Sequence, residues 1–246
     1  MDQRNKLEVC FTPLLLKGYP NMEAIVVIID VLRATSSICS AFANGVKSII
    51  PVAETSEALE YKKKGFLVAG ERDGIVLDFA DFGNSPENFE PSLIAGKTVV
   101  YTTTNGTRTI HMASGYHLTI IGSFLNADAL VNFLEDSGRD VLLLCAGWKD
   151  RFNLEDSVCA GYMASLLLET GNYSTECDSA KAAVDLWGIA REDLRAFIDK
   201  SSHRHRLKVK NLDHCIDFCL TTGFTDIVPM LSDGELIAAG KSYKER

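Results

Sequence analysis

The stretch AIVVIIDVLRATSS, residues 24–37, decides the fold expected of this chain. Its opening run, AIVVII, is small or β-branched and apolar without polar alternation, which is typical of a strand buried on both faces. Asp30 ends that run, and Arg33 and Thr35 follow it. The next segment, ICSAFANG, is typical of a helix that ends at Gly45. We therefore expect a carboxylate, a guanidinium and a hydroxyl where a buried strand turns into a helix, a place where α/β proteins bind anions.

The rest of the chain repeats this alternation of strands and helices. Its 246 residues are 46% hydrophobic, with a mean hydropathy of +0.05, which is ordinary for a globular protein. The alternation predicts one domain over residues 1–246, with a mostly parallel sheet covered on both faces and a helical part at about 177–222. The tail, IVPML and ELIAA about the turn Ser232-Asp233-Gly234, predicts an antiparallel hairpin.

Charge and cysteine content narrow the functional class. The formal net charge is −8, with 25 basic and 33 acidic residues and no Lys/Arg run typical of nucleic-acid binding, so we expect no nucleic-acid partner. The seven cysteines include no CxxC pair and favour reduced thiols over a disulfide framework. No apolar run has the length of a membrane span and no signal peptide is seen, so we expect a cytoplasmic protein without a membrane partner.

Polar clusters follow four of the predicted buried strands. Because the carboxyl ends of parallel strands meet at one edge of a sheet, we expect these clusters to converge. Carboxylates from several segments suit Mg²⁺, and arginines suit a phosphate, carboxylate or sulfonate. The pattern predicts a site for phosphoryl transfer or phosphate hydrolysis on a small anionic substrate. The clusters are Asp30 with Arg33 and Thr35, Glu71 with Arg72, residues 102–108, and Arg151 with Glu155 and Asp156.

Other interpretations of these residues stay open from the sequence. Asp30 and Arg33 also suit a structural ion pair, and acidic residues favour any helix start. Cys145 and Arg151 fit the Cys-x5-Arg spacing of cysteine phosphatases, although no His precedes the cysteine and a buried inert thiol is the usual case. The same arginines also suit a second class of protein, one that binds a small anionic metabolite without catalysing a reaction. The basic segment SSHRHR, residues 201–206, suits either a solvated patch or a lid that donates to an anionic substrate.

Several stretches together resemble the 2-phosphosulfolactate phosphatase family. They are IDVLRATSSI at 29–38, GERDG at 70–74 with DFGNSPENF at 81–89, TTTNGTRTI at 102–110, and LEDSVCAG at 154–161. The resemblance implies a three-layer α/β/α sandwich and a homodimer. It also implies Mg²⁺-dependent hydrolysis of 2-phospho-3-sulfolactate to 3-sulfolactate and phosphate, a reaction linked to coenzyme M biosynthesis. The segment WKDR at 148–151 is bulkier and more charged than the family pattern.

The pattern and the resemblance together assign three sets of site residues. The expected catalytic residues are Asp30, Arg33, Asn105 and Arg108. The expected Mg²⁺ ligands are Asp30, Glu71, Glu155 and Asp156. The expected substrate-binding residues are Thr35, Arg72, Asn84, Ser85, Thr103, Gly106, Thr107 and Arg151. Position 32 is Leu, where aspartyl-phosphate enzymes carry a second acid, so a metal ligand is the preferred role for Asp30 over a nucleophile. Direct attack by water and initial attack by Asp30 both stay open.

Overall fold

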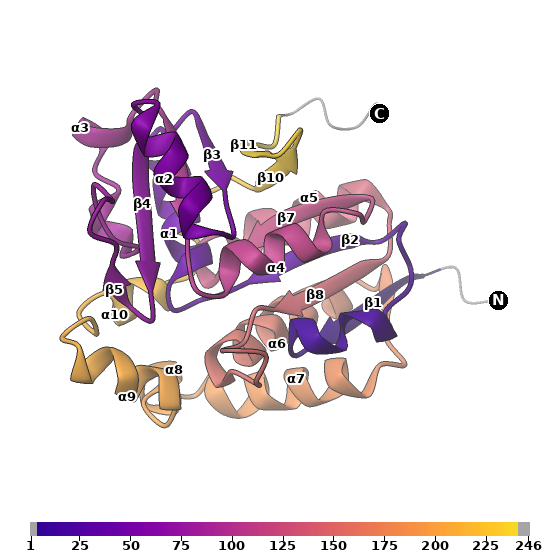
Figure 1. Cartoon of the computed structure of the whole chain (residues 1–246). Helices are drawn as coiled ribbons and strands as arrows, with labels where there is room; N and C mark the ends of the chain where they lie inside the picture. The colour runs from indigo at the N-terminus through magenta and orange to yellow at the C-terminus, as the bar shows by residue number, and fades with distance from the viewer. Residues whose placement is uncertain (1–3, 241–246) are drawn as a thin grey trace.

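A mixed sheet runs through the computed structural model, which describes residues 4–240 (Figure 1). The strand order is β5-β4-β6-β3-β11-β10-β7-β2-β8-β1-β9. In chain order the strands are β1 Asn5–Cys10, β2 Ile25–Ile29, β3 Ser48–Pro51, β4 Leu67–Arg72, β5 Ile75–Val76, β6 Thr98–Thr102, β7 Leu118–Gly122, β8 Val141–Cys145, β9 Tyr173–Ser174, β10 Pro229–Ser232 and β11 Glu235–Ala238.

The sheet consists of two parallel blocks joined by the hairpin of β10 and β11. One block is β4-β6-β3 and the other is β7-β2-β8-β1-β9. The hairpin strands pair antiparallel with each other, with β3 and with β7. After these three antiparallel pairings, the strands of one block run opposite to the strands of the other. Strong twist between the blocks compensates: in Figure 1 β4 points down and β8 points left, and both end toward α9 and α10. The strand ends therefore converge through twist, and not along one edge of a single parallel sheet as expected from the sequence.

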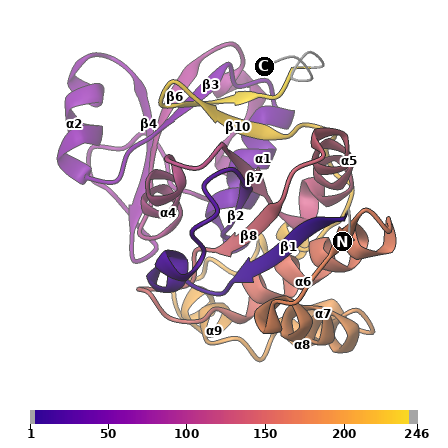
Figure 2. The same cartoon turned by 90° about the vertical axis from the view of Figure 1, so that its right-hand side faces the viewer.

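Helices cover both faces of the sheet, which confirms the three-layer α/β/α architecture. Helices α5, α6 and α7 lie on one face of the larger block and α1 and α4 on the other (Figure 2), while α2 packs on the outer face of the smaller block. The helices are α1 Ala34–Ala43, α2 Thr55–Lys63, α3 Pro91–Ile94, α4 Gly106–Ala113, α5 Ala127–Ser137, α6 Leu154–Glu169, α7 Asp178–Ala190, α8 Leu194–Ile198, α9 Ser202–Val209 and α10 Ile216–Cys219, with 3-10 turns η1 Pro13–Gly18, η2 Pro86–Asn88 and η3 Phe124–Asn126. None of the helices in the described part of the chain has the length and apolar character needed to cross a membrane.

Strand β2 is buried on both faces, as its composition predicts. Ile25, Val27 and Ile29 pack in the core with α5 and α6. Val26 and Ile28 point the other way and pack in the core with α1. Alternate side chains of a strand face opposite sides of the sheet, so a strand with a core on both sides needs an unbroken apolar run.

Helix α1 lies against the larger block and the hairpin and holds the loop before η2. It contacts β7 and β10 as well as η2 and η3. Its small residues allow close packing, and its hydroxyls are satisfied inside the protein: Ser36 Oγ donates to Val31 O at 2.9 Å and Ser37 Oγ donates to Asn84 O at 2.6 Å. The helix therefore connects the carboxyl end of β2 to the loop that carries Asn84.

Candidate active site

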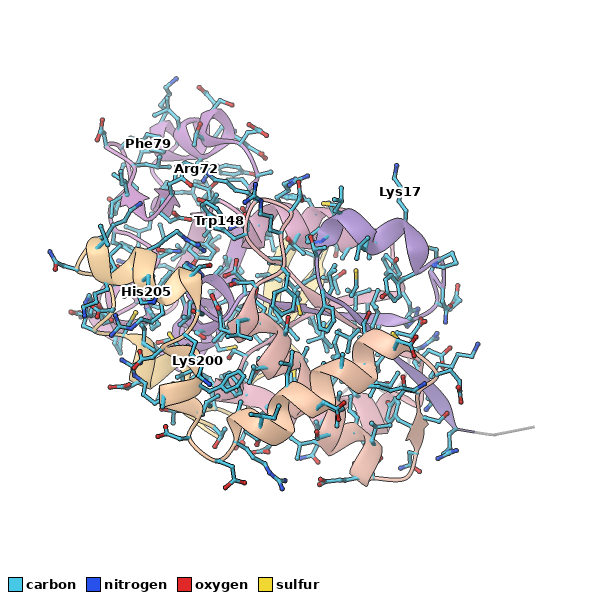
Figure 3. The ribbon with its side chains drawn as sticks, turned by 90° about the horizontal axis from the view of Figure 1, so that it is seen from below. Lys17, Arg72, Phe79, Trp148, Lys200 and His205 are labelled. Carbon is cyan, nitrogen blue, oxygen red and sulfur yellow. The ribbon has the colours of Figure 1, made fainter. Side chains whose placement is uncertain are left out.

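A cavity of about 240 Å³ lies where the carboxyl ends of β2, β4 and β6 meet the loop after β8 and helix α9. In the view from below, Trp148 lies between Arg72 and His205 (Figure 3). Most of the lining residues are polar or charged, as expected for a site that binds a small anion. They are Asp30, Leu32, Arg33, Glu71, Asp73, Gly74, Asn84, Thr103, Thr104, Asn105, Trp148, Lys149, His203, Arg206, Leu207 and Lys210.

Asp30 lines the cavity from the end of β2 and is only 6% exposed. The turn that positions it is fixed by Thr35, whose Oγ1 accepts from Asp30 N–H at 3.1 Å and whose N–H donates to Asp30 O at 2.8 Å. Thr35 is fully buried and lies outside the cavity lining. Burial raises the pKa of the Asp30 carboxyl to about 6, against the opposing charge of His203, and Glu71 adds to the rise.

Arg33 is a buried cation beside Asp30 with unused hydrogen-bonding capacity. Its Nη2 donates to Asn84 Oδ1 at 2.8 Å. Its Nη1 is buried without a hydrogen-bond partner, and no carboxylate in residues 4–240 forms an ion pair with it. The structural ion pair with Asp30 is therefore absent. A guanidinium that lines a cavity with a free donor is suited to bind an anionic oxygen.

Glu71 lines the cavity but is already hydrogen-bonded. Its Oε1 accepts from Thr104 N–H at 2.8 Å, and its Oε2 accepts from Gly74 N–H at 2.5 Å. Arg72 lies outside the cavity lining, because β4 continues through both residues and neighbouring side chains of a strand point to opposite faces. Its guanidinium donates to Glu71 O, to Ala53 O and to Thr102 Oγ1. The structure therefore brings Glu71 to the cavity and leaves Arg72 outside it.

The two acids at the start of α6 have different surroundings. Asp156 accepts from Val31 N–H at 2.9 Å and from Gly147 N–H at 3.1 Å, so it joins the loop after β2 to the loop after β8. Glu155 Oε1 is 2.6 Å from Nδ1 of His203, which lines the cavity. Glu155 Oε2 is buried without a partner in the described residues. Neither acid is among the residues that line the cavity.

The loop between β6 and α4 supplies two of the predicted lining residues, Thr103 and Asn105. Gly106 supports them from behind, because a Cβ there would lie 2.7 Å from Ala34 Cβ and 3.0 Å from Asp30 Oδ2. Thr107 Oγ1 accepts from Thr103 N–H at 3.2 Å and donates to Thr103 O, so it shapes the loop.

Three further predicted residues lie outside the cavity lining. Arg108 pairs with Asp150 at 3.0 Å, and its side chain is 53% exposed. Arg151 is exposed and forms backbone hydrogen bonds with Trp148. Ser85 is buried, and its N–H donates to Asn88 Oδ1 at 3.3 Å.

One wall of the cavity consists mainly of residues that the sequence did not assign. Trp148 and Lys149 come from the loop after β8, and His203, Arg206 and Lys210 come from α9 and the residue after it. The sequence gives two signals for this wall, the bulky charged segment WKDR at 148–151 and the basic segment 201–206. The sequence leaves two interpretations of residues 201–206 open, a solvated patch and a lid over the substrate. The structure places His203 and Arg206 of this segment at the cavity.

Cys145 lacks the surroundings of a nucleophilic thiol. It is fully buried at the end of β8 and is not among the lining residues. Burial raises its pKa well above the ordinary value, and the charge of Asp156 adds to the rise. Reactive cysteines are exposed thiolates with a lowered pKa, so the structure does not favour the cysteine mechanism.

The carboxylates at and near the cavity suit a Mg²⁺ ion that is bound by only one or two protein side chains. No group of three or more His, Cys, Asp or Glu side chains within residues 4–240 is arranged to hold a metal ion. Mg²⁺ in proteins is often bound by one or two carboxylates, several waters and a substrate phosphate. Asp30, at the cavity, and the unpartnered Oε2 of Glu155 have the chemistry of such ligands. Glu71 and Asp156 fit less well, because N–H donors occupy their oxygens.

The fold and the cavity define an α/β protein with an arginine-lined site for a small anion at the ends of its strands. The model of the 2-phosphosulpholactate phosphatase family matches residues 10–234. The chain belongs to this family, and it is an enzyme of the phosphoric monoester hydrolase class.

Curated relatives agree with this assignment. A probable 2-phosphosulfolactate phosphatase of Thermotoga maritima is 40% identical over 212 residues, which cover 86% of this chain and 90% of that protein. Another from Caldanaerobacter subterraneus is 36% identical over 216 residues, covering 86% and 89%. A third, from Clostridium novyi, is 34% identical over 207 residues, covering 83% and 87%.

Proposed function

We propose that the chain hydrolyses 2-phospho-3-sulfolactate to 3-sulfolactate and phosphate with Mg²⁺ as its cofactor. Family membership supports the reaction class, and the sulfonated substrate follows from the names of the relatives. The observation that carries the proposal is Arg33, a buried guanidinium whose Nη1 has no hydrogen-bond partner in the described residues and which lines the same cavity as Asp30. Arg33 suits an anionic oxygen and the Asp30 carboxylate suits a cation, which supports a phosphate ester and Mg²⁺ as the ligands.

The residues of the cavity have distinct roles in this proposal. Arg33 donates from Nη1 to a phosphoryl oxygen and neutralises charge that develops in the transition state, and Asn84 holds its other terminal nitrogen. Thr103 and Asn105 line the cavity near Asp30 and orient the ester. In the reaction the water oxygen bonds to phosphorus and the bond between phosphorus and the ester oxygen on C2 breaks. The ester oxygen takes up one proton to become a hydroxyl, and the attacking water gives up one.

Asp30 and Glu155 are the proposed protein ligands of the cation. Bound Mg²⁺ would polarise the phosphoryl oxygen and lower the pKa of a coordinated water. Glu71 and Asp156, the other two ligands expected from the sequence, act in this proposal by fixing the loops around the cavity.

Phosphate release from a panel of small phosphate esters, with Mg²⁺ or with EDTA, tests the proposal. We expect release from 2-phosphosulfolactate with Mg²⁺ and none with EDTA. Asp30→Asn and Arg33→Ala should each lower kcat/KM by about 100-fold or more. Full activity in EDTA with loss on thiol alkylation would instead support Cys145. Binding without release from any sulfonated or carboxylated ester would support a non-catalytic binder. A cytoplasmic location, a homodimer and a place in coenzyme M biosynthesis stay predictions from the sequence.

A further inference from the structure

Arg206 is a second arginine in the lining of the cavity that Arg33 lines. It lies on α9, and its guanidinium carbon is 4.0 Å from the centroid of the Trp148 ring. Its Nη1 donates to Ser202 Oγ at 3.1 Å. Burial lowers the pKa of its guanidinium, and the negative charges of Glu155 and Asp73 oppose that shift. No carboxylate in residues 4–240 forms an ion pair with it. Arg206 therefore has hydrogen-bonding capacity for an anion that enters the cavity.

Trp148, which stacks on Arg206, belongs to a loop that several backbone hydrogen bonds fix in place. Trp148 N–H donates to Arg151 O at 3.0 Å, and Arg151 N–H donates back to Trp148 O at 3.1 Å. Gly147, with φ +62°, allows this turn, because a Cβ there would lie 2.3 Å from Arg151 O. Lys149 N–H donates to Asn105 Oδ1 at 3.1 Å, which ties the loop to the start of α4. These bonds hold the loop that carries the ring, and aromatic faces attract guanidinium groups.

The neighbouring lysines at the cavity have partners. Lys149 Nζ pairs with Asp73 Oδ1 at 2.8 Å, and Lys210 Nζ donates to Asp73 O. Arg33 and Arg206 are consequently the two lining arginines without an ion-pair partner in the described part of the chain. One follows β2 and is buried beside Asp30, while the other comes from α9. Such a pair suits a ligand with two separate anionic groups.

We propose that Arg206, positioned by Trp148, binds the second anionic group of the substrate while Arg33 binds its phosphoryl group. This inference rests on the proposed function and names the residues that select a phosphate ester bearing a sulfonate or carboxylate. The sequence assigned substrate binding to Arg72, but Arg72 lies outside the cavity lining and its guanidinium already donates to three oxygen atoms. In this proposal Arg206 binds the substrate instead. Arg206 contacts substrate in this proposal, and Trp148 acts through Arg206.

Two substrates that differ in the second anionic group test the role of Arg206. Glycerol 2-phosphate has its phosphate on C2, like 2-phosphosulfolactate, but hydroxyls replace the sulfonate and carboxylate. Arg206→Ala should raise KM for 2-phosphosulfolactate about 10- to 100-fold and leave KM for glycerol 2-phosphate within about threefold. Lys208→Ala removes the same charge from the same helix at an exposed position outside the cavity, and should change neither. Equal effects of Arg206→Ala on both substrates would overturn the proposal.

The positioning role of Trp148 has its own readout. Trp148→Leu should raise KM for 2-phosphosulfolactate about 3- to 10-fold with little change in kcat, and Trp148→Phe should retain most of the affinity because it keeps a ring. In a Trp187→Phe background Trp148 is the sole tryptophan, and its emission should change when 3-sulfolactate binds. Arg206→Ala should abolish that change, and persistence of the change would contradict the proposal.

Failure of this inference differs from failure of the proposed function. If the unsubstituted enzyme hydrolyses neither ester, the proposed function fails, while 3-sulfolactate binding still reports on Arg206. If it hydrolyses 2-phosphosulfolactate and Arg206→Ala does not weaken its binding, the inference alone fails.

Discussion

At the scale of single residues, buried carboxylates near the cavity serve either the ligand or the loops around it. Asp156 is fully buried, and its oxygens accept from Val31 N–H, from Gly147 N–H and from Asn153 Nδ2. All three partners are donors, so a carboxylate with two acceptor oxygens matches them. Asp30 lies at the cavity instead, where an anion or a cation can reach it.

Replacing Asp156 by Asn should destabilise the protein. The amide NH₂ would face an N–H donor in either orientation, which leaves a buried donor unsatisfied at a cost of about 1–3 kcal/mol. Urea denaturation measures the change. The control is Asp150→Asn, which removes an exposed ion pair with Arg108 and should cost less than about 1 kcal/mol. Equal effects of the two substitutions would contradict a structural role for Asp156.

His214 connects the segment before α10 to η2 by a hydrogen bond from its ring to Glu87 Oε1. That bond raises the pKa of His214 above its ordinary value of 6.5. A raised folded-state pKa means that this contact stabilises the protein fully below the unfolded-state pKa, and the contribution is lost as pH rises through the folded-state pKa.

NMR titration of the His214 ring should therefore give a midpoint above 6.5. Glu87→Gln should lower that midpoint, because the charged partner is removed. Glu90→Gln removes the same charge from a residue without a contact to His214, and it should leave the midpoint unchanged. An unchanged midpoint in Glu87→Gln would show that the contact does not form in solution.

The site can be predicted residue by residue only where local sequence decides the geometry. Asp30 and Arg33 follow a clearly buried strand, and the structure places both in the cavity lining. It assigns Arg72 to the substrate because the apolar run of that strand ends at Ala69. The strand in fact continues to Arg72, and alternation turns that side chain away. Arg206 is missed because its platform, Trp148, comes from a distant segment that only the tertiary structure brings close.

At the scale of elements, α6 and α7 pack closely because one residue in their contact has no side chain. A Cβ on Gly161 of α6 would lie 1.9 Å from Ala183 O of α7. Gly188, also on α7, is exposed, and a Cβ there would meet nothing within 4 Å. The same substitution therefore has opposite consequences at the two glycines.

Gly161→Ala should lower the free energy of unfolding by about 1–3 kcal/mol or more, because the helices must move apart. Gly188→Ala should raise it by about 0.5–1 kcal/mol, because Ala loses less backbone entropy than Gly in a helix. Chemical denaturation of both variants measures the difference. A neutral Gly161→Ala would mean that the two helices are not in close contact.

Elements with strong local signals can be predicted, and short ones cannot. The hairpin of β10 and β11 is expected from apolar segments about Ser232-Asp233-Gly234, and the structure confirms it. The two-residue strands β5 and β9 are not expected, because they depend on pairing with β4 and β1 and carry no periodic pattern of their own.

At the scale of the whole molecule, the hairpin is what makes one sheet from two blocks. Its central position between β3 and β7 cannot be predicted, because the chain order places it last and nothing local specifies its neighbours. The twist across it brings the ends of β4 and β6 to the end of β2, and the cavity forms there. Residues of α1 also share one buried hydrophobic cluster with Ile49 of β3 and Val99 of β6 in the smaller block and with Ile121 of β7 in the larger one. We therefore expect the two blocks to unfold together.

Leu236 tests this cooperativity. It is fully buried in β11, pairs with Ile49 of β3 and packs in the core that contains α1. Leu236→Ala should cost about 2–5 kcal/mol through lost burial and the cavity left behind. The next residue, Ile237, points to the opposite face and is 36% exposed, so Ile237→Ala should cost less than about 1 kcal/mol.

The decisive measurement is whether two probes of Leu236→Ala report the same transition in urea. In a Trp148→Phe background, Trp187 is the sole tryptophan. It lies on α7, which covers the larger block, whereas far-UV circular dichroism reports on all helices and strands. If the hairpin and α1 couple the blocks, the Trp187 fluorescence and dichroism curves coincide and shift together to lower urea. Separate curves, with the Trp187 transition unmoved, would mean that the larger block is stable without the smaller one. The cavity would then lie between two independently stable units, because its walls come from both blocks.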